Sequence, residues 1–250
     1  MEWLGSDLAT ARGIGRYLEY TLLRPEATAA EVGRLCDEAA ALGVRAVCVN
    51  GAWVPASVER LRGTGVAVVG VVGFPLGAAA PAVKAVEARL GAVDGAEELD
   101  MVMALGAARA GDWAAVADEV RMVVGAVPGV AVKVIVETAI FGPPEIERAC
   151  RVAREAAARF VKTSTGFHPA GGATVEAVRV MRRAVGPEFG VKAAGGIRTP
   201  EAALAMLAAG ANRIGASDLA GLRGILGPDA PLLVDLLRRA GGGGGAGGAA

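Results

Sequence analysis

The four lysines are the side chains in this sequence whose type and placement best suit chemistry. Lysine and arginine together number 26, yet only four of them are lysines: Lys84, Lys133, Lys162 and Lys192. Arginine keeps its proton inside proteins, whereas a buried lysine can lose its proton and attack a carbonyl carbon. In a chain that otherwise uses arginine, the few lysines therefore indicate positions where an amine is needed.

Lys162 has the most informative surroundings, the segment RFVKTSTGF at residues 159–167. The apolar pair before Lys162 predicts the end of a buried strand. The turn that Thr163 opens predicts the mouth of a pocket, with Thr163 as a candidate substrate contact. Burial lowers the pKa of a lysine, which makes Lys162 a candidate nucleophile. Taken alone, the segment also fits an ordinary surface lysine in a loop.

Three more charged residues in β-like runs favour the chemical interpretation. Asp100, Lys133 and Lys192 lie in the runs ELDMVM, AVKVIVE and FGVKA. A neighbouring like charge disfavours protonation of an amine, so Lys192 should lower the pKa of Lys162. A shift of about 3 units would correspond to roughly 4 kcal/mol. Asp100 would hold the remaining charge and relay protons. The alternative is a structural network of ion pairs that fills the protein interior.

The elements that must position these residues alternate regularly along the chain. Eight β-like segments alternate with helical segments, which predicts an α/β protein with a single (β/α)8 (TIM) barrel, whose catalytic side chains lie at the carboxyl ends of the strands. A doubly wound open sheet is the alternative, but it would usually carry a glycine-rich phosphate turn after the first strand, and none is present there. The predicted strands are 19–22, 44–49, 66–73, 98–103, 131–137, 160–162, 189–193 and 213–215.

Small residues after the last three predicted strands could bind an anion. They are Gly171, Gly172, Gly195, Gly196 and Ser217. Glycines let backbone N–H groups approach an anion, and Ser217 is expected to open a helix whose N-terminus favours negative charge. The loops after strands 7 and 8 are the usual phosphate site of these barrels. The chain has 37 glycines, so glycine pairs in loops are expected anyway. The evidence for an anion site is the position of these pairs after the last strands.

The remaining organisation is simple. One barrel domain is expected over 1–240, followed by a flexible, low-complexity Gly/Ala tail at 241–250. Residues 1–18 predict a short N-terminal capping helix. Thr28 and Glu31 predict a capping box at the start of the next helix.

Composition excludes several classes of function. Acidic and basic residues both number 26 and the pI is about 6.6, so neither a nucleic-acid partner nor a membrane partner is expected. The start shows no secretory signal pattern. Three widely spaced cysteines predict neither a disulfide framework nor a zinc site, and the single histidine, His168, leaves no multi-histidine metal site. We expect a cytoplasmic protein without a metal or cofactor.

Six segments of the chain resemble, in order, those of the deoxyribose-phosphate aldolase family. They are TLLRPEAT (21–28), AVCVN (46–50), VVGFPLGA (71–78), ELDMVM (98–103), VKTSTGF (161–167) and VKAAGGIRT (191–199). The resemblance covers residues 15–225. It implies a metal-free class I aldolase with a (β/α)8 fold, which acts on small sugar phosphates and aldehydes and forms a homo-oligomer, either a dimer or a tetramer.

The resemblance also implies an activity, the reversible cleavage of 2-deoxy-D-ribose 5-phosphate to D-glyceraldehyde 3-phosphate and acetaldehyde. Lys162 would form the Schiff base, Lys192 would tune Lys162, and Asp100 would be the proton-relay acid. Lys133 would lie beside them as a supporting charge in the substrate site.

Several positions depart from the family pattern. Glu19 and Tyr20 stand where Asp-His is common, and Ala104 stands where an Asn is common. Asp218 follows Ser217, where another small residue is frequent. Its carboxylate would repel a phosphate unless it turns away to cap a helix.

Two rival functions remain at this point. One keeps the Schiff base but acts on another substrate, such as a keto-sugar phosphate or an unphosphorylated aldehyde, and Asp218 would favour it. The other is a barrel that has lost catalysis and only binds a ligand. Retention of Asp100, Lys162 and Lys192 argues against the second.

Overall fold

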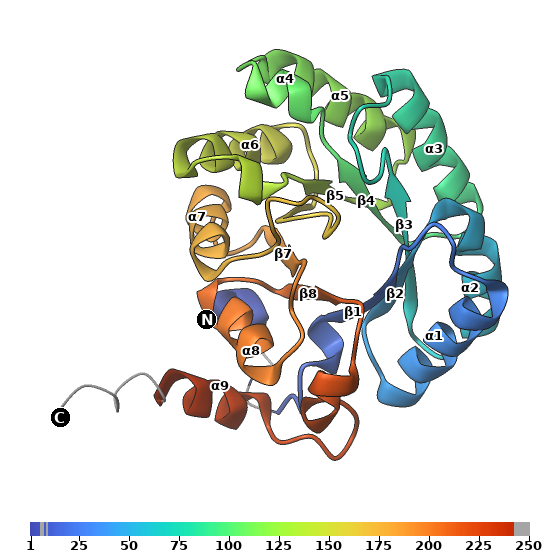
Figure 1. The fold of residues 1–250 in the computed structure, drawn as a ribbon, viewed down its shortest axis with the longest axis vertical. Coiled ribbons are helices and arrows are strands. Elements are labelled where there is room, and N and C mark those ends of the chain that lie inside the picture. The colour runs from blue at the N-terminus through green and yellow to red at the C-terminus, as the bar shows by residue number, and fades with distance from the viewer. Residues whose placement is uncertain (6–7, 9, 243–250) are drawn as a thin grey trace.

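Eight parallel strands, β1 to β8 in chain order, close into a barrel (Figure 1). The computed structural model describes residues 1–5, 8 and 10–242. Strand β8 pairs with β1 and so completes the circle. The closed barrel confirms the predicted (β/α)8 architecture over the open sheet. The strands are β1 (Leu18–Leu22), β2 (Ala46–Val49), β3 (Ala67–Val72), β4 (Glu98–Val102), β5 (Ala131–Ile135), β6 (Phe160–Lys162), β7 (Gly190–Ala194) and β8 (Arg213–Ala216).

Helices surround the barrel and alternate with its strands along the chain (Figure 1). The α-helices are α1 (Ala29–Leu42), α2 (Val54–Leu61), α3 (Pro81–Val93), α4 (Leu105–Arg109), α5 (Trp113–Ala126), α6 (Pro143–Glu155), α7 (Val175–Val185), α8 (Pro200–Ala209) and α9 (Leu233–Gly242). The 3-10 helices are η1 (Glu2–Leu4), η2 (Gly15–Tyr17), η3 (Gly51–Trp53), η4 (Thr138–Ile140) and η5 (Ala220–Ile225). In the described part of the chain, none of these helices has the length and apolar character needed to cross a membrane.

Local sequence explains where helix α1 begins and ends. The Thr28 hydroxyl accepts a hydrogen bond from the Glu31 N–H, and the Thr28 N–H donates to the Glu31 carboxylate at 2.8 Å. This is the predicted capping box. Gly43 ends the helix in the left-handed conformation, with φ of 59°. Between these ends, Leu35 and Ala39 are buried on the face that packs against the barrel.

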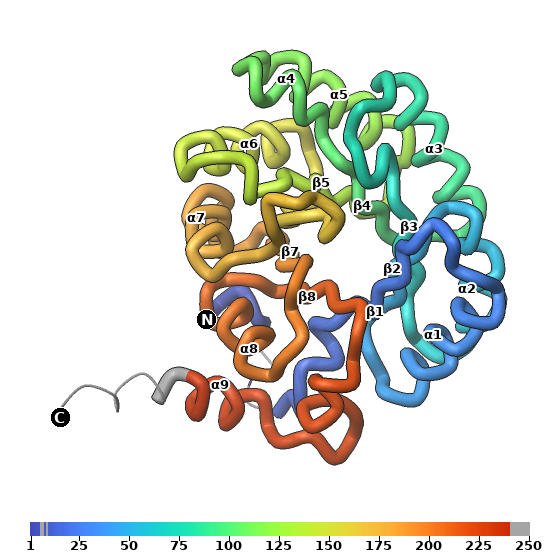
Figure 2. Tube along the Cα trace, in the orientation of Figure 1, coloured from blue at the N-terminus to red at the C-terminus, as the bar shows by residue number. Residues whose placement is uncertain are grey.

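The N-terminal segment differs from the single capping helix expected over 1–18. Its described residues form η1 and η2, because Gly5 and Gly13 have positive φ angles that interrupt a helix. Arg12 then forms an antiparallel bridge with Leu232. The N-terminal segment therefore lies beside the chain that leads into α9 (Figure 2).

The C-terminal part differs in two ways. The helix after β8 begins at Ala220 and is the 3-10 helix η5, so Ser217 does not open a helix as the sequence predicted. The Asp218 carboxylate accepts the Ala220 N–H, and Leu219 is the residue that precedes η5. Helix α9 includes Gly241 and Gly242, the first two residues of the predicted tail, and the rest of that tail lies outside the described residues.

Candidate active site

Strand register gathers the charged residues along the barrel axis. Asp100 of β4 pairs in register with Lys133 of β5, and Lys162 of β6 pairs with Lys192 of β7. Side chains alternate along each strand, so residues in matched register point to the same side of the sheet. All four lysines of the chain are buried, and none exposes more than 2% of its surface.

Asp100 is the centre of the cluster. Its Oδ1 accepts from Lys133 Nζ at 2.9 Å, and its Oδ2 accepts from Lys162 Nζ at 2.7 Å and Lys192 Nζ at 2.6 Å. Burial opposes ionisation of this carboxyl, but the three lysine charges outweigh burial and hold the pKa of Asp100 well below its usual range. Asp100 is therefore a carboxylate at neutral pH. The structure brings together all four charged residues that the sequence singled out.

Three further charged residues extend this cluster below Asp100, and sequence reasoning did not assign them to the site. Lys133 Nζ lies 2.7 Å from Glu98 Oε2, and Glu19 contacts Lys192. Arg213 lies 3.5 Å from Glu98 and 3.4 Å from Glu19. Glu98 precedes Asp100 by two residues in a strand and so shares its face, which is a signal that the sequence contained.

The pKa values of this lower group also favour charged forms. Burial opposes the ionisation of Glu98, but Lys133 and Arg213 outweigh burial and lower the pKa of Glu98 to about 2. Burial alone would lower the pKa of Lys192, yet Asp100 and Glu19 raise the pKa of Lys192 above its ordinary value. The same balance of burial against Asp100 and Glu19 raises the pKa of Lys133.

Among the buried members of the cluster, cations outnumber carboxylates by one, and the partly exposed Arg45 also pairs with Glu98 at 3.5 Å. Each carboxylate contacts at least two cations. The three carboxylates belong to Glu19, Glu98 and Asp100, and the four buried cations belong to Lys133, Lys162, Lys192 and Arg213. An unbalanced charge is costly in a low-dielectric interior. Loss of one proton from one lysine would make the buried part of the cluster, without the partly exposed Arg45, neutral.

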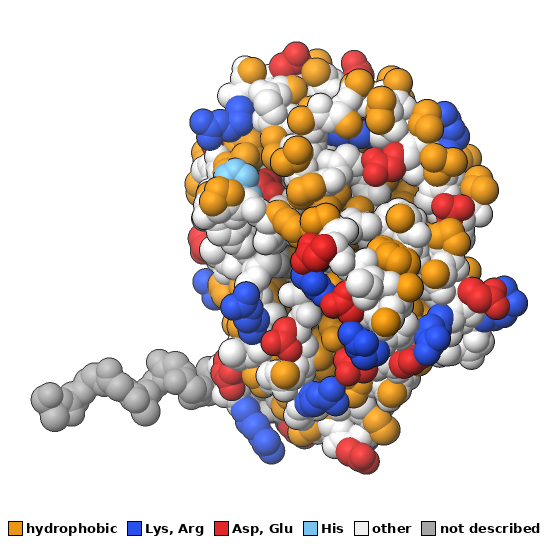
Figure 3. All heavy atoms as spheres, turned by 45° about the vertical axis from the view of Figure 1, so that its right-hand side comes forward, with side chains coloured by type: hydrophobic (Ala, Val, Ile, Leu, Met, Phe, Trp, Pro, Cys, Tyr) orange, Lys and Arg blue, Asp and Glu red, His pale blue; other side chains and the backbone are white. Residues whose placement is uncertain are grey.

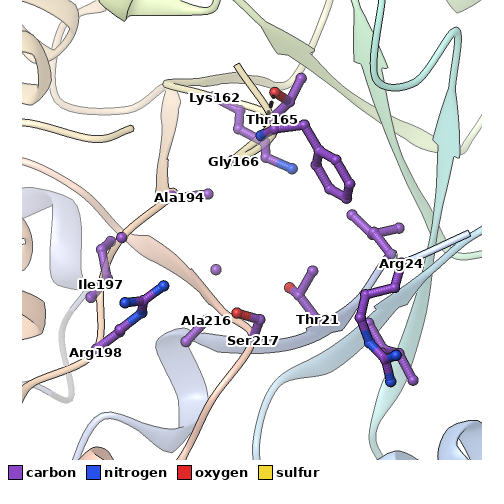
Figure 4. A pocket seen from close by; sticks show the side chains of 16 residues that line it. Thr21, Arg24, Lys162, Thr165, Gly166, Ala194, Ile197, Arg198, Ala216 and Ser217 are labelled. Atoms are coloured by element: carbon purple, nitrogen blue, oxygen red, sulfur yellow. Dashed lines mark hydrogen bonds between the residues drawn. The ribbon is translucent and has the colours of Figure 1, made fainter. Parts of the chain in front are cut away.

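A pocket of about 330 Å³ opens at the carboxyl ends of the strands (Figure 4). Lys162 is the one member of the buried cluster that lines this pocket, and Figure 4 shows its amine pointing into the open space. Of the residues expected to contact substrate, Gly195, Gly196 and Ser217 also line it.

The other expected substrate contacts lie outside the pocket lining. Lys133 is fully buried beneath Asp100. The Thr163 hydroxyl donates to the Ala194 carbonyl and accepts from the Ala194 N–H, both at 3.0 Å, and so joins β6 to β7. Gly171 does not line the pocket, and Gly172 packs on the loop that does. A Cβ on Gly172 would lie 2.3 Å from the Gly195 carbonyl oxygen, so Gly172 allows the two loops to meet.

Two arginines at the pocket were not assigned from the sequence. Arg24 lies in TLLRPEAT, and it is paired with Glu26 at 3.1 Å and Glu31 at 2.6 Å. Arg198 lies in VKAAGGIRT, and its guanidinium points toward the pocket (Figure 4). Within the described ranges, no carboxylate forms an ion pair with Arg198. Arg198 is therefore the cation best placed to meet an anionic ligand.

Asp218 does not line this pocket. Its Oδ1 accepts the Ala220 N–H at 2.8 Å, at the start of η5. The Asp218 carboxylate is therefore held by the backbone two residues further on, whereas the neighbouring Ser217 lines the pocket.

Aromatic rings form one wall beside the Lys162 amine. The Phe74 and Phe167 rings meet edge to face, with their centroids 5.3 Å apart. Lys162 Nζ lies 5.9 Å from the centre of the Phe74 ring. Thr165, which also lines the pocket, donates its hydroxyl to the buried Glu137 carboxylate at 2.6 Å.

Glu19, Cys48 and Asp100 are close enough to share a metal ion, with their ligand atoms within 4.8 Å of one another. However, Lys192 donates to both carboxylates. Burial raises the pKa of the Cys48 thiol to about 11, so the thiolate that metals prefer is disfavoured. We therefore treat the three as part of the ion-pair cluster.

Comparison with known proteins gives a consistent result. Residues 18–227 match the family described as DeoC/LacD family aldolase. The deoxyribose-phosphate aldolase of Mycobacterium avium is 52% identical over 221 residues, which cover 87% of this chain and 97% of that protein. The Thermococcus gammatolerans enzyme of the same name is 52% identical over 208 residues, 82% of this chain and 92% of that protein.

A solved structure agrees with these matches. The tetrameric deoxyribose phosphate aldolase from Aeropyrum pernix superposes with a TM-score of 0.79 at 33% identity. The superposition covers 84% of this chain and 90% of that one.

Proposed function

Because this chain belongs to the DeoC/LacD family of aldolases, we propose that it reversibly cleaves 2-deoxy-D-ribose 5-phosphate to D-glyceraldehyde 3-phosphate and acetaldehyde. The reaction would proceed through a Schiff base on Lys162. One observation carries this proposal above the others. Lys162 belongs to a buried cluster with one surplus positive charge, and its amine alone among those cations reaches the pocket.

The surplus charge supports the nucleophilic role of Lys162. Lys133, Lys192 and Arg213 together balance Glu19, Glu98 and Asp100. The raised pKa values of Lys133 and Lys192 keep these two lysines charged. Lys162 is the cation of this cluster that lines the pocket, so its amine is the one placed to meet a carbonyl group. Neutral Lys162 has the free electron pair that attack on a carbonyl requires.

The bond changes follow from that state. In the direction of synthesis, Lys162 Nζ attacks the carbonyl carbon of acetaldehyde, a C–N bond forms, and the carbonyl oxygen leaves as water. The resulting iminium accepts electrons, so a methyl proton can be removed to give an enamine. The enamine carbon attacks the aldehyde carbon of D-glyceraldehyde 3-phosphate, and water then releases the product from the lysine. Cleavage is the reverse sequence.

Asp100 and Lys192 are the groups placed to assist. Asp100 Oδ2 lies 2.7 Å from the Lys162 amine and is close enough to accept its proton. Lys192 shares the same oxygen at 2.6 Å and places a positive charge next to Lys162.

The far side of the pocket suits the phosphate. Gly195 and Gly196 line it with backbone in the left-handed region, with φ of 94° and 81°, which a side chain would strain. Ser217 adds a hydroxyl, and Arg198 adds a guanidinium that can bind phosphate through two parallel hydrogen bonds. Asp218 does not line the pocket and is not among these groups.

Trapping tests this proposal. The protein is incubated with acetaldehyde, reduced with borohydride, and digested to locate the ethyl group by mass spectrometry. The ethyl group is expected on Lys162, and Lys162→Arg should abolish both adduct and turnover because arginine stays protonated. An adduct elsewhere, or turnover by Lys162→Arg, would contradict the Schiff-base role. Turnover of 2-deoxyribose with and without its 5-phosphate then tests the substrate.

We also propose that the chain assembles into a homo-oligomer in the cytoplasm. The Aeropyrum pernix relative is a tetramer. Helix α3 exposes an apolar stripe, and Figure 3 shows apolar side chains gathered over the upper part of the face to which α3 belongs. The stripe consists of Val83, Val86, Leu90 and Val93. Such exposed stripes commonly mark protein contacts. Three buried free cysteines fit a reducing compartment.

A further inference from the structure

Lys84 is the one lysine that belongs neither to the ion-pair cluster around Asp100 nor to the proposed mechanism. It lies on helix α3, outside the barrel (Figure 1), yet it exposes 0% of its surface. Its partner Glu119, on α5, exposes 1%, and Lys84 Nζ lies 2.6 Å from Glu119 Oε1. A buried ion pair adds little stability, because the cost of desolvation offsets the attraction. The pair is better explained by the backbone groups that it holds.

The Lys84 ammonium group uses all of its hydrogens. Besides the Glu119 carboxylate, its Nζ donates to the carbonyl oxygens of Gly77 and Val102, both at 2.8 Å. A lysine carries three N–H donors on one compact nitrogen, whereas the guanidinium of an arginine is planar and larger. Three acceptors around one buried nitrogen therefore require a lysine. This explains why Lys84 is a lysine in a chain that otherwise uses arginine.

These contacts join the loops that follow β3 and β4. Gly77 lies in the β3 loop, and Val102 is the last residue of β4. The second carboxylate oxygen of Glu119 accepts the N–H of Ala104, just beyond β4, at 2.7 Å. The two loops also touch, since a Cβ on Gly77 would lie 2.4 Å from the Met103 carbonyl oxygen. The ion pair thus ties the two loops to each other and to helices α3 and α5.

Helix α3 holds the β3 loop at both ends, with Phe74 between them. The ion pair holds the far end, and Glu87 of the same helix accepts the Gly73 N–H at the near end, at 2.7 Å. Gly73 also makes room for the lysine, because an added Cβ would lie 2.7 Å from Lys84 Cε. The Phe74 ring centre lies 5.9 Å from Lys162 Nζ. The place of this ring beside the amine therefore depends on how α3 holds the loop.

The end of β4 matters because this strand carries Asp100. Asp100 lies two residues before Val102, whose carbonyl Lys84 binds. Its Oδ2 is 2.7 Å from the Lys162 amine, within reach for proton transfer. A displacement of about 1 Å in an active site can lower the rate roughly 100-fold. Holding the end of β4 therefore preserves the distance on which the proton transfer depends.

We propose that Lys84 and Glu119 are positioning residues for the aldol reaction. By holding the loops after β3 and β4, they keep Asp100 and Phe74 in place beside Lys162. The inference rests on the proposed function, because it requires Lys162 to form the imine. In the described part of the chain, no hydrogen bond of the pair reaches the loops after β7 and β8, which form the side of the pocket that suits the phosphate. Loss of the pair should therefore slow the reaction without weakening the binding of substrate.

The test compares stability with turnover in three variants. Lys84→Arg keeps the charge but not the compact ammonium group. Lys84→Met leaves Glu119 buried without its cation, which is expected to destabilise the fold. Combining Lys84→Met with Glu119→Gln leaves no unpaired charge, so the free energy of unfolding should recover. In all three, kcat for 2-deoxyribose 5-phosphate, expressed per folded protein from denaturant unfolding, is expected to fall by roughly tenfold or more, with KM within about twofold of the wild-type value.

Asp118→Asn is the matched control. Asp118 precedes Glu119 on α5 and forms an ion pair with Arg121 at 2.8 Å, but both side chains are more than half exposed. This variant should show wild-type kcat and KM. A difference from wild type as large as that of the Lys84 variants would overturn the proposal, because any lost ion pair on α5 would then have the same effect.

The remaining outcomes separate positioning from stability and from the proposed function. A double variant that regains both stability and turnover would overturn the positioning role, because the pair would then act through stability alone. Normal turnover in Lys84→Arg, or a raised KM with unchanged kcat, would overturn it as well. If Lys84→Met does not fold, the double variant and Lys84→Arg decide the matter. Absence of an ethyl group on wild-type Lys162 after trapping with acetaldehyde would instead contradict the proposed function.

Discussion

Lys162 differs from the other three lysines in what surrounds its amine. Lys84 is held by the Glu119 carboxylate at 2.6 Å and by two backbone carbonyls, and Lys133 is enclosed by carboxylates. Lys192 contacts both Glu19 and Asp100. Among the described residues, Lys162 has a single carboxylate partner, Asp100, and its side chain lines the pocket. The reactivity proposed for this one amine among four would thus follow from its position in the cluster rather than from residue type.

Replacing Lys192 tests the coupling between the two neighbouring lysines. Lys192→Met keeps an unbranched chain but removes the positive charge that disfavours a second charge on Lys162. The optimum of kcat/KM for cleavage is expected to move to higher pH, with a lower maximum, in a full pH–rate profile. Lys192→Arg is the control that keeps the charge. A profile whose optimum stays at the wild-type pH would show that the two amines act independently.

At the scale of elements, the loops after β6 and β7 support each other through a glycine contact. Gly172 approaches the Gly195 backbone so closely that an added Cβ would lie 2.3 Å from a carbonyl oxygen. Because that neighbour is backbone, one of the two loops must shift to make room. Gly195 and Gly196, on the β7 loop, line the pocket. A change at Gly172 should therefore reach the site indirectly.

Gly172→Ala is expected to raise KM for 2-deoxyribose 5-phosphate at least severalfold and to destabilise the fold by about 1–3 kcal/mol, the usual cost of overpacking. Steady-state kinetics and denaturant unfolding measure the two effects. Gly106→Ala is the matched control, since nothing lies within 4 Å of its added Cβ in helix α4. Equal KM values for the two variants would indicate that the loops do not cooperate in binding.

Elements were largely predictable from the sequence because each depends on a local pattern. The run 66–73 is apolar on both faces, and β3 is buried along its whole length. Thr28 and Glu31 marked the start of α1. The prediction was wrong at Ser217, because η5 begins only at Ala220, and the point at which a helix starts after β8 depends on the tertiary course of the chain.

The site was less predictable because it depends on contacts between distant strands. Asp100, Lys162 and Lys192 could be selected from their runs, and the structure places them within hydrogen-bond distance. Arg213 joins the cluster because barrel closure brings β8 beside β1. The Arg213 side chain then forms an ion pair with Glu19. No local pattern carries that information.

Charged side chains fill the interior of this barrel, where other barrels have apolar side chains. Glu98, Lys133 and Arg213 occupy the lower part of the interior, and the pocket lies above them. The stability of the fold should therefore depend on pH. The pKa of Glu98 falls from its ordinary value of 4.5 to about 2 on folding. Its contribution to the free energy of unfolding is present above pH 4.5 and is lost as the pH falls toward 2.

Glu98→Gln tests this dependence. The variant is expected to be less stable than wild type at pH 7 by about 3–5 kcal/mol, since Lys133 and Arg213 lose a partner. The difference should shrink as the pH falls from 4.5 toward 2, where wild-type Glu98 also becomes neutral. Denaturant unfolding at a series of pH values measures it, and Glu97→Gln, at the exposed neighbouring position, should track wild type. A difference that stays constant down to pH 2 would contradict the lowered pKa.

The burial of every lysine has a practical consequence for a protein that handles aldehydes. Aldehydes react with accessible amines, and a typical protein surface offers many lysines that would be modified at random. Here the exposed positive charges are carried by arginine, and all four lysines expose 2% or less of their surface. Lys162 is the lysine that an aldehyde can reach through the pocket. Amine-selective reagents small enough to enter should therefore label its side chain almost to the exclusion of the other lysines. The protein should accordingly resist the surface modification and crosslinking that concentrated aldehydes cause.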